Sequence, residues 1–488
     1  MSSFHIVNFG CRATQADAAA IERQLVERGC ARADSRAGAD FVVVNTCTVT
    51  ASADSQARQA IRHLHRENPD ARIVVTGCYA QRAPEELARM EGVAWVVGNS
   101  HKPEIRSLVG QTSRSVHENA LAQLQPAQPP LAPILTGDVF ALDSVLVAPI
   151  EGGESDLGAG RTRPILKIQD GCNYRCSYCV IPFVRGRSRS LPPAQAIEEI
   201  RKLAGAGYKE IVLSGISLGS YGHDLEPRPD LSGRRIELTD LVRRILDETP
   251  LEQLRLSSVE PMDITRDLVE LVASSDRIAR HFHIPLQSGS DRILAKMHRW
   301  YRAEHYARRL ELIRKLLPDA AIGADLIVGF PGETDADHRA TVEFVRAMPF
   351  TYLHVFAFSA RPGTPAASLP DPVPPRVAKQ RSKELRSLAA EKAAAFRAAH
   401  VGRTLRVLTL QASREECSPR LQTRGSSPCA EIPASKEAGY RENLWTPAIT
   451  SNYLKVRVAG SHPRNTWLTV RLTGTANSHL VGDLLGRS

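Results

Sequence analysis

The chain has no long apolar run. Among its 488 residues, no stretch reaches the roughly 18 consecutive apolar residues that a membrane-spanning helix needs, so no membrane association is expected. The first residues, MSSFHIVNFGCRATQAD, lack the basic segment followed by an apolar core that marks a signal peptide. Both absences favour a cytoplasmic protein, and the length suits about three domains.

Acidic residues are fewer than basic ones. The chain has 63 Lys and Arg residues against 53 Asp and Glu residues, which gives a formal net charge of +10 spread along the sequence. This excess fits a partner with a phosphate backbone, and it equally fits a basic surface without such a partner. Composition alone leaves both readings open.

Disulfide bonds are also not expected. The nine cysteines are an odd number, and in a cytosolic chain clustered cysteines are more often metal ligands than disulfides. Six of them fall into two groups of three. Cys30 is expected to pack at a helix end, whereas Cys417 and Cys429 lie in a Ser/Pro-rich insertion at residues 414–438 and have no assigned role.

The first hundred residues alternate between strand-like and helix-like patterns. The apolar runs at 4–9, 41–45, 72–76 and 94–98 predict strands, and the segments 17–29 and 52–69 between them predict helices. This alternation predicts a small parallel sheet within an N-terminal domain of residues 1–110.

Three cysteines follow three of these strands at equivalent positions: Cys11 in NFGC, Cys47 in NTC and Cys78 in TGC. Parallel strands end at one common edge of the sheet, and open α/β sheets bind ligands at that edge. The sequence therefore predicts a cysteine ligand set there. The alternative is three unrelated small core residues, because unpaired cysteine is common in protein interiors.

The rest of the chain divides into three further segments. Residues 111–160 are linker-like, although VFALDSVLVAP is a candidate edge strand. Residues 161–400 contain six strand candidates separated by helix-length segments, which predicts a partial (β/α) barrel, and 376–400 predicts a long helix. Alternating apolar and polar residues within 401–488 predict a small β-barrel. The predicted fold class is α/β with this additional β domain.

The loop after the first barrel strand, DGCNYRCSYC, contains Cys172, Cys176 and Cys179. Three thiolates on one short loop suit three corners of a [4Fe–4S] cluster and leave the fourth iron open for a small molecule. An open coordination position is typical of sites that perform chemistry. A structural zinc site with a distant fourth ligand is the alternative.

This loop, with Tyr178 before its last cysteine, resembles the signature of radical S-adenosylmethionine (SAM) enzymes. The resemblance implies that SAM chelates the open iron through its methionine part. It also implies that SAM cleavage yields a 5′-deoxyadenosyl radical that abstracts hydrogen from carbon.

The resemblance extends over nearly the whole chain to the methylthiotransferases. NFGC, NTCTVT and TGCYAQ in the N-terminal segment, CNYRCSYC and IPFVRGRSRS in the central one, and NYLKVRV in the last resemble that family. The family implies a second [4Fe–4S] cluster on Cys11, Cys47 and Cys78 and a C-terminal RNA-binding TRAM domain.

Further family segments suggest SAM contacts around the barrel. LSGISLGSYG lies where the superfamily binds the methionine amino group, and Gly329 and Gly332 would allow close backbone approach to adenosine. Arg255 and Gln287 are polar residues near expected strand ends, where ligand contact and structural hydrogen bonding are equally open. The resulting set of expected contacts is Tyr178, Ser214, Gly215, Arg255, Ser257, Gln287, Ile327 and Gly329.

The pattern NTCTVTASAD followed by SQARQAIRHLHRENPDARIVVTGCYAQ resembles the threonylcarbamoyladenosine branch of the family. The implied reaction adds a methylthio group to C2 of that modified adenosine, at position 37 of tRNA. The implied partners are tRNA, an electron donor such as a reductase or flavodoxin, and a sulfur source. The base must leave its stack to react, and Arg185, Arg187 and Arg189 are candidates for holding phosphates.

Other functions remain open from sequence. The related branches act on isopentenyladenosine in tRNA or on an aspartate of a ribosomal protein. A two-cluster electron carrier is disfavoured, because carriers normally close each cluster with four cysteines. An RNA-binding protein with structural zinc is a further alternative.

Overall fold

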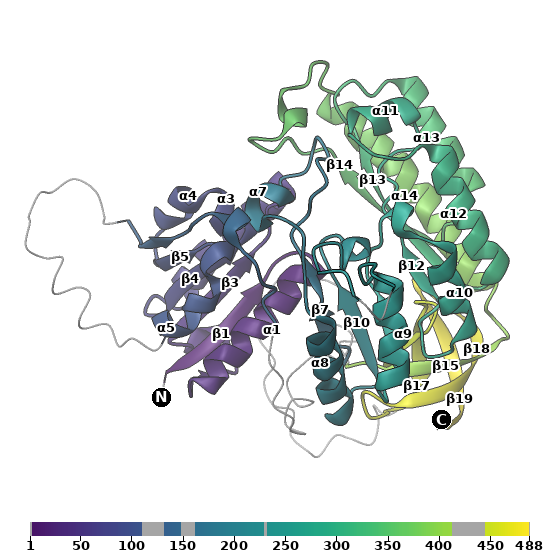
Figure 1. Ribbon diagram of the computed structural model, residues 1–488, viewed down its shortest axis with the longest axis horizontal. Helices are drawn as coiled ribbons and strands as arrows, with labels where there is room; N and C mark the ends of the chain where they lie inside the picture. Colours follow the sequence, from purple (N-terminus) through teal and green to yellow (C-terminus); the bar gives the residue numbers. More distant parts are fainter. Residues whose placement is uncertain (1, 110–130, 148–161, 229–231, 412–444, 488) are drawn as a thin grey trace, which may run out of the picture.

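The computed structural model describes residues 2–109, 131–147, 162–228, 232–411 and 445–487. Three parts follow one another along the chain, from the purple and blue N-terminal part to the teal and green central part and the yellow C-terminal part (Figure 1). The insertion at 414–438, with Cys417 and Cys429, lies outside the described residues.

The N-terminal part is a six-stranded parallel sheet with the order β2-β1-β3-β4-β5-β6. The four strands predicted from sequence are present. The bounds are β1 Ser3–Asn8, β2 Ala31–Arg32, β3 Phe41–Thr46, β4 Arg72–Gly77, β5 Val93–Val97 and β6 Ile134–Leu135.

The edge strand comes from a different segment than the one suggested by VFALDSVLVAP. Ile134–Leu135 pairs with β5, whereas Val139–Ala141 forms a 3-10 turn, η3. The Asp138 carboxylate accepts a hydrogen bond from the Phe140 amide at 2.8 Å and caps this turn. A local side-chain cap thus competes successfully with strand pairing here.

The central strand β3 is buried on both faces, as its continuous apolar sequence requires. Phe41 and Val43 pack with α1 and α5, whereas Val42 and Val44 pack with α2, α3 and α4. This alternation gives the sheet a helix layer on each side. The helices are α1 Arg12–Glu27, α2 Ala51–Glu67, α3 Cys78–Arg82, α4 Pro84–Ala88 and α5 Ile105–Val109, with the 3-10 helix η2 at Asn99–Glu104.

The central part is the predicted partial barrel. Its six parallel strands form two sheets, β11-β10-β7 and β12-β13-β14, which isolated bridges such as Ser258 to His283 connect between β11 and β12. The strands are β7 Ile165–Lys167, β10 Glu210–Ser214, β11 Gln253–Leu256, β12 His281–His283, β13 Ala321–Val328 and β14 Tyr352–Ala357. The helices are α8 Pro193–Gly205, α9 Leu238–Glu248, α10 Arg266–Ser274, α11 Asp291–Lys296, α12 Ala303–Leu316, α13 Asp335–Ala347 and α14 Pro375–Ala398.

The strands of the partial barrel turn one face towards the helices and one away from them. Leu254 and Leu256 of β11 belong to the main hydrophobic core with the helices. Because side chains alternate along a strand, Arg255 projects to the opposite face, which we call the inner face. The same alternation places Asp325 and Ile327 of β13 on the inner face, since Ala324 and Leu326 belong to the core.

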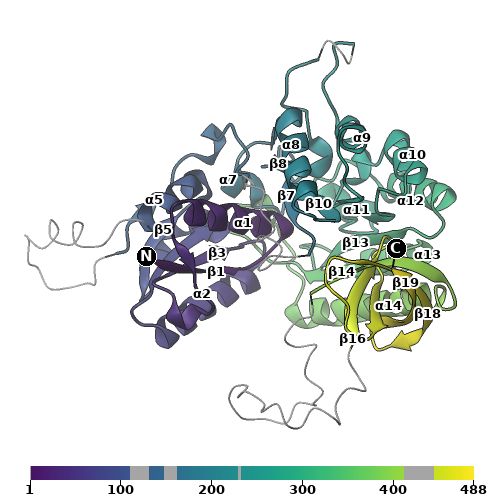
Figure 2. The ribbon, with the colours of Figure 1, turned by 90° about the horizontal axis from the view of Figure 1, so that it is seen from below.

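The C-terminal part is a closed barrel of five strands, as the alternating pattern predicts. Its strands are β15 Thr404–Thr409, β16 Trp445–Thr450, β17 Lys455–Ala459, β18 Trp467–Ala476 and β19 His479–Arg487. Figure 2 shows it lying beside α14 and the strands β13 and β14. Among the described residues, no helix combines the length and hydrophobicity that a membrane crossing needs.

The turn after β16 fixes the C-terminal barrel to the amino-terminal end of the partial barrel. The Tyr453 ring stacks on the imidazole of His281, the first residue of β12, with ring centroids 4.4 Å apart. The Asn452 side-chain amide donates a hydrogen bond to the Asp319 carbonyl at 3.0 Å. The opposite end, where the strands finish, remains available for a functional site.

Candidate functional site

Cys11, Cys47 and Cys78 lie at one edge of the N-terminal sheet. They follow β1, β3 and β4, which are neighbours in the sheet and parallel. Gly10, with φ of +111°, lets two of these loops approach, because a Cβ there would lie 2.5 Å from the Cys47 Cβ. Burial, together with the neighbouring thiolates of Cys11 and Cys78, raises the pKa of the Cys47 thiol to about 12.

Cys172, Cys176 and Cys179 lie on the segment between two short antiparallel strands, β8 Gln169–Asp170 and β9 Arg189–Ser190. Backbone hydrogen bonds shape this loop: the Cys172 amide donates to the Gly186 carbonyl at 3.1 Å, and the Cys179 amide donates to the Cys176 carbonyl at 3.0 Å. Burial and the neighbouring Cys176 raise the pKa of Cys179 to about 12. These thiols therefore need a cation beside them to ionise near neutral pH.

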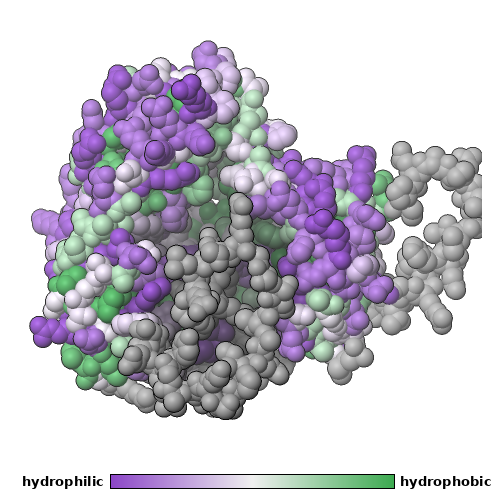
Figure 3. All heavy atoms as spheres, turned by 180° about the vertical axis from the view of Figure 1, so that it is seen from behind, coloured by the Kyte–Doolittle hydropathy of each residue, from purple (hydrophilic) through white to green (hydrophobic). Residues whose placement is uncertain are grey.

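The N-terminal trio approaches the cysteine loop through Cys78. The Cys78 side chain belongs to a small hydrophobic cluster with Val180 and Val184, and these two residues belong to the segment directly after Cys179. That segment continues as α7, Ile181–Arg185, and the Arg185 Nε donates a hydrogen bond to the Cys78 Sγ at 3.2 Å. Figure 3 shows the surface hollowed between the N-terminal part and the partial barrel.

The spacing of the thiols discriminates between two kinds of metal centre. In a tetrahedral zinc site with Zn–S distances of about 2.3 Å, two sulfurs lie about 3.8 Å apart. Among the described residues, the three side chains whose potential ligand atoms all lie within 4.8 Å of one another are those of His283, Asp325 and His354. Neither cysteine trio is that compact, which argues against a single zinc ion. A [4Fe–4S] cluster holds each thiolate on a different iron and accommodates wider spacing.

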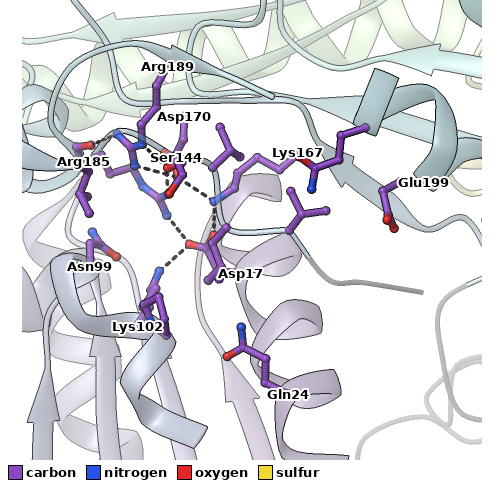
Figure 4. Close-up of a pocket in the computed structure, with 16 residues that line it drawn as sticks. Asp17, Gln24, Asn99, Lys102, Ser144, Lys167, Asp170, Arg185, Arg189 and Glu199 are labelled. Atoms are coloured by element: carbon purple, nitrogen blue, oxygen red, sulfur yellow. Dashed lines mark hydrogen bonds and ion pairs between the residues drawn. The ribbon is translucent and has the colours of Figure 1, made fainter. Parts of the chain in front are cut away.

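A buried network of charges joins the two parts beside the cysteines (Figure 4). The carboxylate of Asp17, on α1, accepts hydrogen bonds from Lys102 at 2.5 Å, from Arg185 at 2.8 Å and from Lys167. Asp170 accepts from Lys167 at 2.7 Å and from Arg185 at 2.9 Å. Burial raises the pKa of Asp17, but the three cations outweigh burial and hold that pKa well below its usual value. A cavity of about 380 Å³ lies against this network.

This network changes the interpretation of the arginine run after the cysteine loop. Arg185 is only 2% exposed and Arg189 only 7% exposed. The Arg189 guanidinium donates to the Ser144 carbonyl at 2.6 Å and to the Arg185 carbonyl at 2.7 Å. Neither residue is free to hold a tRNA phosphate, and of the three only Arg187 is exposed.

Two of the expected SAM contacts are buried hydroxyls on the inner face near strand ends. Ser214 ends β10, and Ser257 directly follows β11; both are less than 5% exposed. Neither hydroxyl has a hydrogen-bond partner within the described structure. Because an unpaired buried hydroxyl is costly, a polar ligand that bonds to both would satisfy them. This observation fits the methionine end of SAM.

Tyr178, Ile327 and Gly215 also lie around this region. Tyr178, from the cysteine loop, and Ile327, from β13, pack against one hydrophobic cluster that contains Met297 and Phe330. The cysteine loop is thereby held next to the carboxyl end of β13. Gly215 leaves room for the side chain of Gln169, since a Cβ there would lie 2.9 Å from the Gln169 Oε1.

Three other expected contacts have structural partners. The Arg255 guanidinium, fully buried, forms an ion pair with Glu210 at 2.6 Å and donates to the Ser451 carbonyl at 2.9 Å. These partners lie at the amino-terminal end of the barrel, so we do not retain Arg255 as a SAM contact. Gly329 has φ of +74° and makes room for Ala378 of α14. Gln287, with φ of +66°, pairs through its backbone with β13.

Arg299 and Glu260 also belong to the site and were not predicted from the sequence. Arg299 Nη1 donates a hydrogen bond to the Cys176 Sγ at 3.3 Å, and Nη2 forms an ion pair with Glu260. Arg185 donates to Cys78 in the same way, so one sulfur of each trio accepts a hydrogen bond from a buried arginine. Arg299 lies 123 residues from Cys176 in sequence, and no local pattern marks it.

Comparison with known proteins identifies the class. Residues 3–98 match the family described as uncharacterized protein family UPF0004, and residues 166–345 match the radical SAM superfamily. The radical SAM methyltransferase TsrM from Kitasatospora setae shares the fold, with a TM-score of 0.53 and 19% identity over 75% of this chain and 77% of that protein. The chain is a radical SAM enzyme, and this membership implies SAM and a [4Fe–4S] cluster.

More similar relatives define the family. A threonylcarbamoyladenosine tRNA methylthiotransferase from Aquifex aeolicus is 36% identical over 83% of this chain and 92% of its own length. One from Bacillus subtilis is 37% identical over 85% of both chains. A tRNA-2-methylthio-N6-dimethylallyladenosine synthase from Sphingopyxis alaskensis is 34% identical over 85% of this chain and 88% of its own. The chain belongs to the methylthiotransferases.

Proposed function

We propose that this enzyme adds a methylthio group to C2 of threonylcarbamoyladenosine beside the anticodon of tRNA. The observation that carries the proposal is the approach of the two cysteine trios, with Cys78 packed against the segment that directly follows Cys179. Two sites that face one hollow suit a reaction that both activates a carbon and delivers sulfur to it. Relatives at 36% and 37% identity carry this activity in their names.

The proposal assigns the thiols to two clusters. Cys172, Cys176 and Cys179 would hold the SAM-binding [4Fe–4S] cluster, and Cys11, Cys47 and Cys78 would hold a second one. The first cluster with SAM and an electron would supply radical chemistry that removes a hydrogen atom from the adenine, and the second would present sulfur that a second SAM methylates. Ser214, Ser257, Gly215, Tyr178 and Ile327 surround SAM, and the position of Gln287 next to Ile327 keeps its side chain a candidate contact.

The residues of the chain itself position and insulate these groups. Arg299 and Arg185 each place a positive charge on one thiolate, which stabilises the ionised sulfur against burial. The hydrophobic cluster around Cys78 and Val180 excludes water between the two sites. Exclusion of water protects a carbon radical from side reactions.

The remaining assignments follow from this function. We propose an N-terminal domain at 1–110, a linker at 111–160, a radical SAM domain at 161–400 and a TRAM-like RNA-binding domain at 401–488. The reaction also needs an electron donor and a source of sulfur. A tRNA substrate and ionised thiol ligands both suit the cytoplasm.

Dimethylallyladenosine in tRNA is the second candidate substrate, because the Sphingopyxis relative is 34% identical over a similar share of the chain. The two candidates differ at N6 of the adenine, where one carries a carboxylate and the other an apolar group.

An assay with purified, anaerobically reconstituted enzyme tests the proposal. The enzyme is incubated with SAM, dithionite, sulfide and tRNA that carries either modified adenosine or unmodified adenosine, and the nucleosides are analysed by mass spectrometry. We expect the methylthio product mainly from threonylcarbamoyladenosine tRNA, with much slower formation from dimethylallyladenosine tRNA and none from unmodified adenosine. Product from the dimethylallyl tRNA alone would assign the enzyme to the second substrate, and absence of product from both would contradict a tRNA substrate.

A further inference from the structure

Three polar side chains meet on the inner face of the partial barrel, outside the cysteine sites. Asp325 of β13 lies between two histidines, with its Oδ1 at 3.2 Å from the His283 Nε2 of β12 and at 3.3 Å from the His354 Nδ1 of β14. The three residues come from adjacent strands, and Asp325 and His354 are direct partners in the register. None of them belongs to the cysteine sites or to the expected SAM contacts.

Asp325 is the charged neighbour of both imidazoles. Burial raises the pKa of Asp325, but the adjacent His283 and His354 outweigh burial and hold that pKa below its usual value. The second ring nitrogen of His283 is bonded to the Ser258 hydroxyl at 2.7 Å. His354 uses Nδ1 for Asp325 and is 56% exposed, so its Nε2 is available to a ligand.

These side chains lie just on the amino-terminal side of the site proposed for the reaction. The next inner-face pair along β13 and β14 is Ile327 and Phe356, two residues closer to the strand ends, or about 6.7 Å. Phe356 is 44% exposed and Ile327 packs in the same cluster as Tyr178 of the cysteine loop. Towards the amino-terminal end of the strands, the His281 Nε2 is hydrogen-bonded to the Tyr352 hydroxyl at 2.8 Å, and this pair covers the inner face there.

Hydrogen bonds hold the segment after β14 against the N-terminal part. The Arg361 guanidinium, four residues past β14, is 3% exposed and donates to the Thr48 hydroxyl at 2.9 Å, next to Cys47. The Ser359 hydroxyl accepts from the Ala51 amide at 3.0 Å. The carboxyl end of β14 is thus fixed to the loop of the second cysteine in the N-terminal trio.

We propose that His354, which lies beside Asp325, binds the carboxylate of an adenosine N6 substituent and so selects threonylcarbamoyladenosine as the substrate. This inference rests on the proposed function and names a residue that determines its specificity. N6 and C2 both lie on the Watson–Crick edge of adenine, so the residues that read the substituent must lie beside the reacting carbon. With both nitrogens protonated, the His354 imidazole faces Asp325 through Nδ1–H and donates Nε2–H to a carboxylate, and an apolar dimethylallyl group would leave that donor without a partner.

The test compares His354→Phe, which keeps a ring but removes the donor, with the unsubstituted holoenzyme. His305→Phe on the outer helix α12 is the matched control, because His305 is exposed and lies outside the site. The ratio of kcat/KM for threonylcarbamoyladenosine tRNA to that for dimethylallyladenosine tRNA is measured for each protein. Iron content and thermal midpoint show whether each variant is folded.

We expect His354→Phe to lower that ratio at least about tenfold, through loss of a hydrogen bond to a charged group. His354→Gln, which can still donate, should recover part of it. His305→Phe should leave it unchanged. A ratio within twofold of the unsubstituted enzyme for folded His354→Phe would overturn this inference while the proposed function stands.

Two other outcomes would also overturn it. One equivalent of zinc or manganese, lost on His354→Phe, would show that the trio is a metal site. An unsubstituted enzyme that modifies neither tRNA would overturn the proposed function, and this inference with it.

Discussion

Replacement of Asp17 by Asn tests how the two cysteine-bearing parts are held together. Asp17 is 1% exposed and accepts from three cations, Lys102, Lys167 and Arg185. Lys167 and Arg185 keep Asp170 as a partner in the variant, whereas Lys102 loses the one carboxylate that it contacts in the described structure. Removal of one partner from a buried ion pair costs about 3–5 kcal/mol.

The assay is urea unfolding of the holoenzyme, followed through tryptophan fluorescence. With a denaturant slope of about 1–3 kcal/mol per molar, a loss of that size moves the first transition by about 1 M or more. Asp34→Asn is the matched control, because Asp34 is exposed in the same part of the chain and should leave the transition in place. The double variant Asp17→Asn/Lys102→Met should lose less than the sum of the two single losses, since no unpaired ammonium remains. Equal transitions for Asp17→Asn and Asp34→Asn would refute the reasoning.

Three further predictions concern the sites. Cys176→Ala should abolish SAM cleavage. Cys47→Ala should retain 5′-deoxyadenosine formation, stop methylthio transfer and lower the iron content from about eight to about four per chain. Normal product from either variant would contradict this division. Arg255→Ala should destabilise the protein by about 3–5 kcal/mol, because the buried Glu210 carboxylate then keeps Arg163, at 3.1 Å, as its ion-pair partner in the described structure. The Kd for SAM, measured on the folded fraction, should stay unchanged, and a large rise in that Kd would restore Arg255 as a SAM contact. Burial and Glu260 raise the pKa of Asp263 to about 6. The contribution of this carboxyl group to stability is therefore full below about pH 3.8 and is lost as the pH rises through 6. Asp263→Asn should raise the thermal midpoint more at pH 8 than at pH 5, and an equal change at both pH values would argue against a raised pKa.

The sequence predicts the elements well because their signals are local. The β-branched run at Val42–Val44 is strand-like by itself, and β10 and β13 of the partial barrel contain similar apolar runs. The two cysteine groups are also local signals, since one lies on a single loop and the other repeats after consecutive strands. Sequence therefore indicates the fold class and the six thiols together.

The charged partners of these thiols are not predictable in the same way. Arg185 and Asp17 are 168 residues apart, and many other arginines and aspartates in the chain are exposed. Which of them become buried depends on how the N-terminal sheet packs against β7. For the same reason, Arg255 resembles a ligand contact in sequence and proves to pair with Glu210 and the C-terminal barrel.

The most direct test of the central claim is nucleoside mass spectrometry of tRNA from cells with and without this gene. The account predicts that the methylthio form of threonylcarbamoyladenosine disappears without the gene and that its precursor accumulates. Restoration by the intact gene, but not by one that encodes Cys176→Ala, would tie the loss to the radical site. An unchanged level of that nucleoside would contradict the proposed substrate.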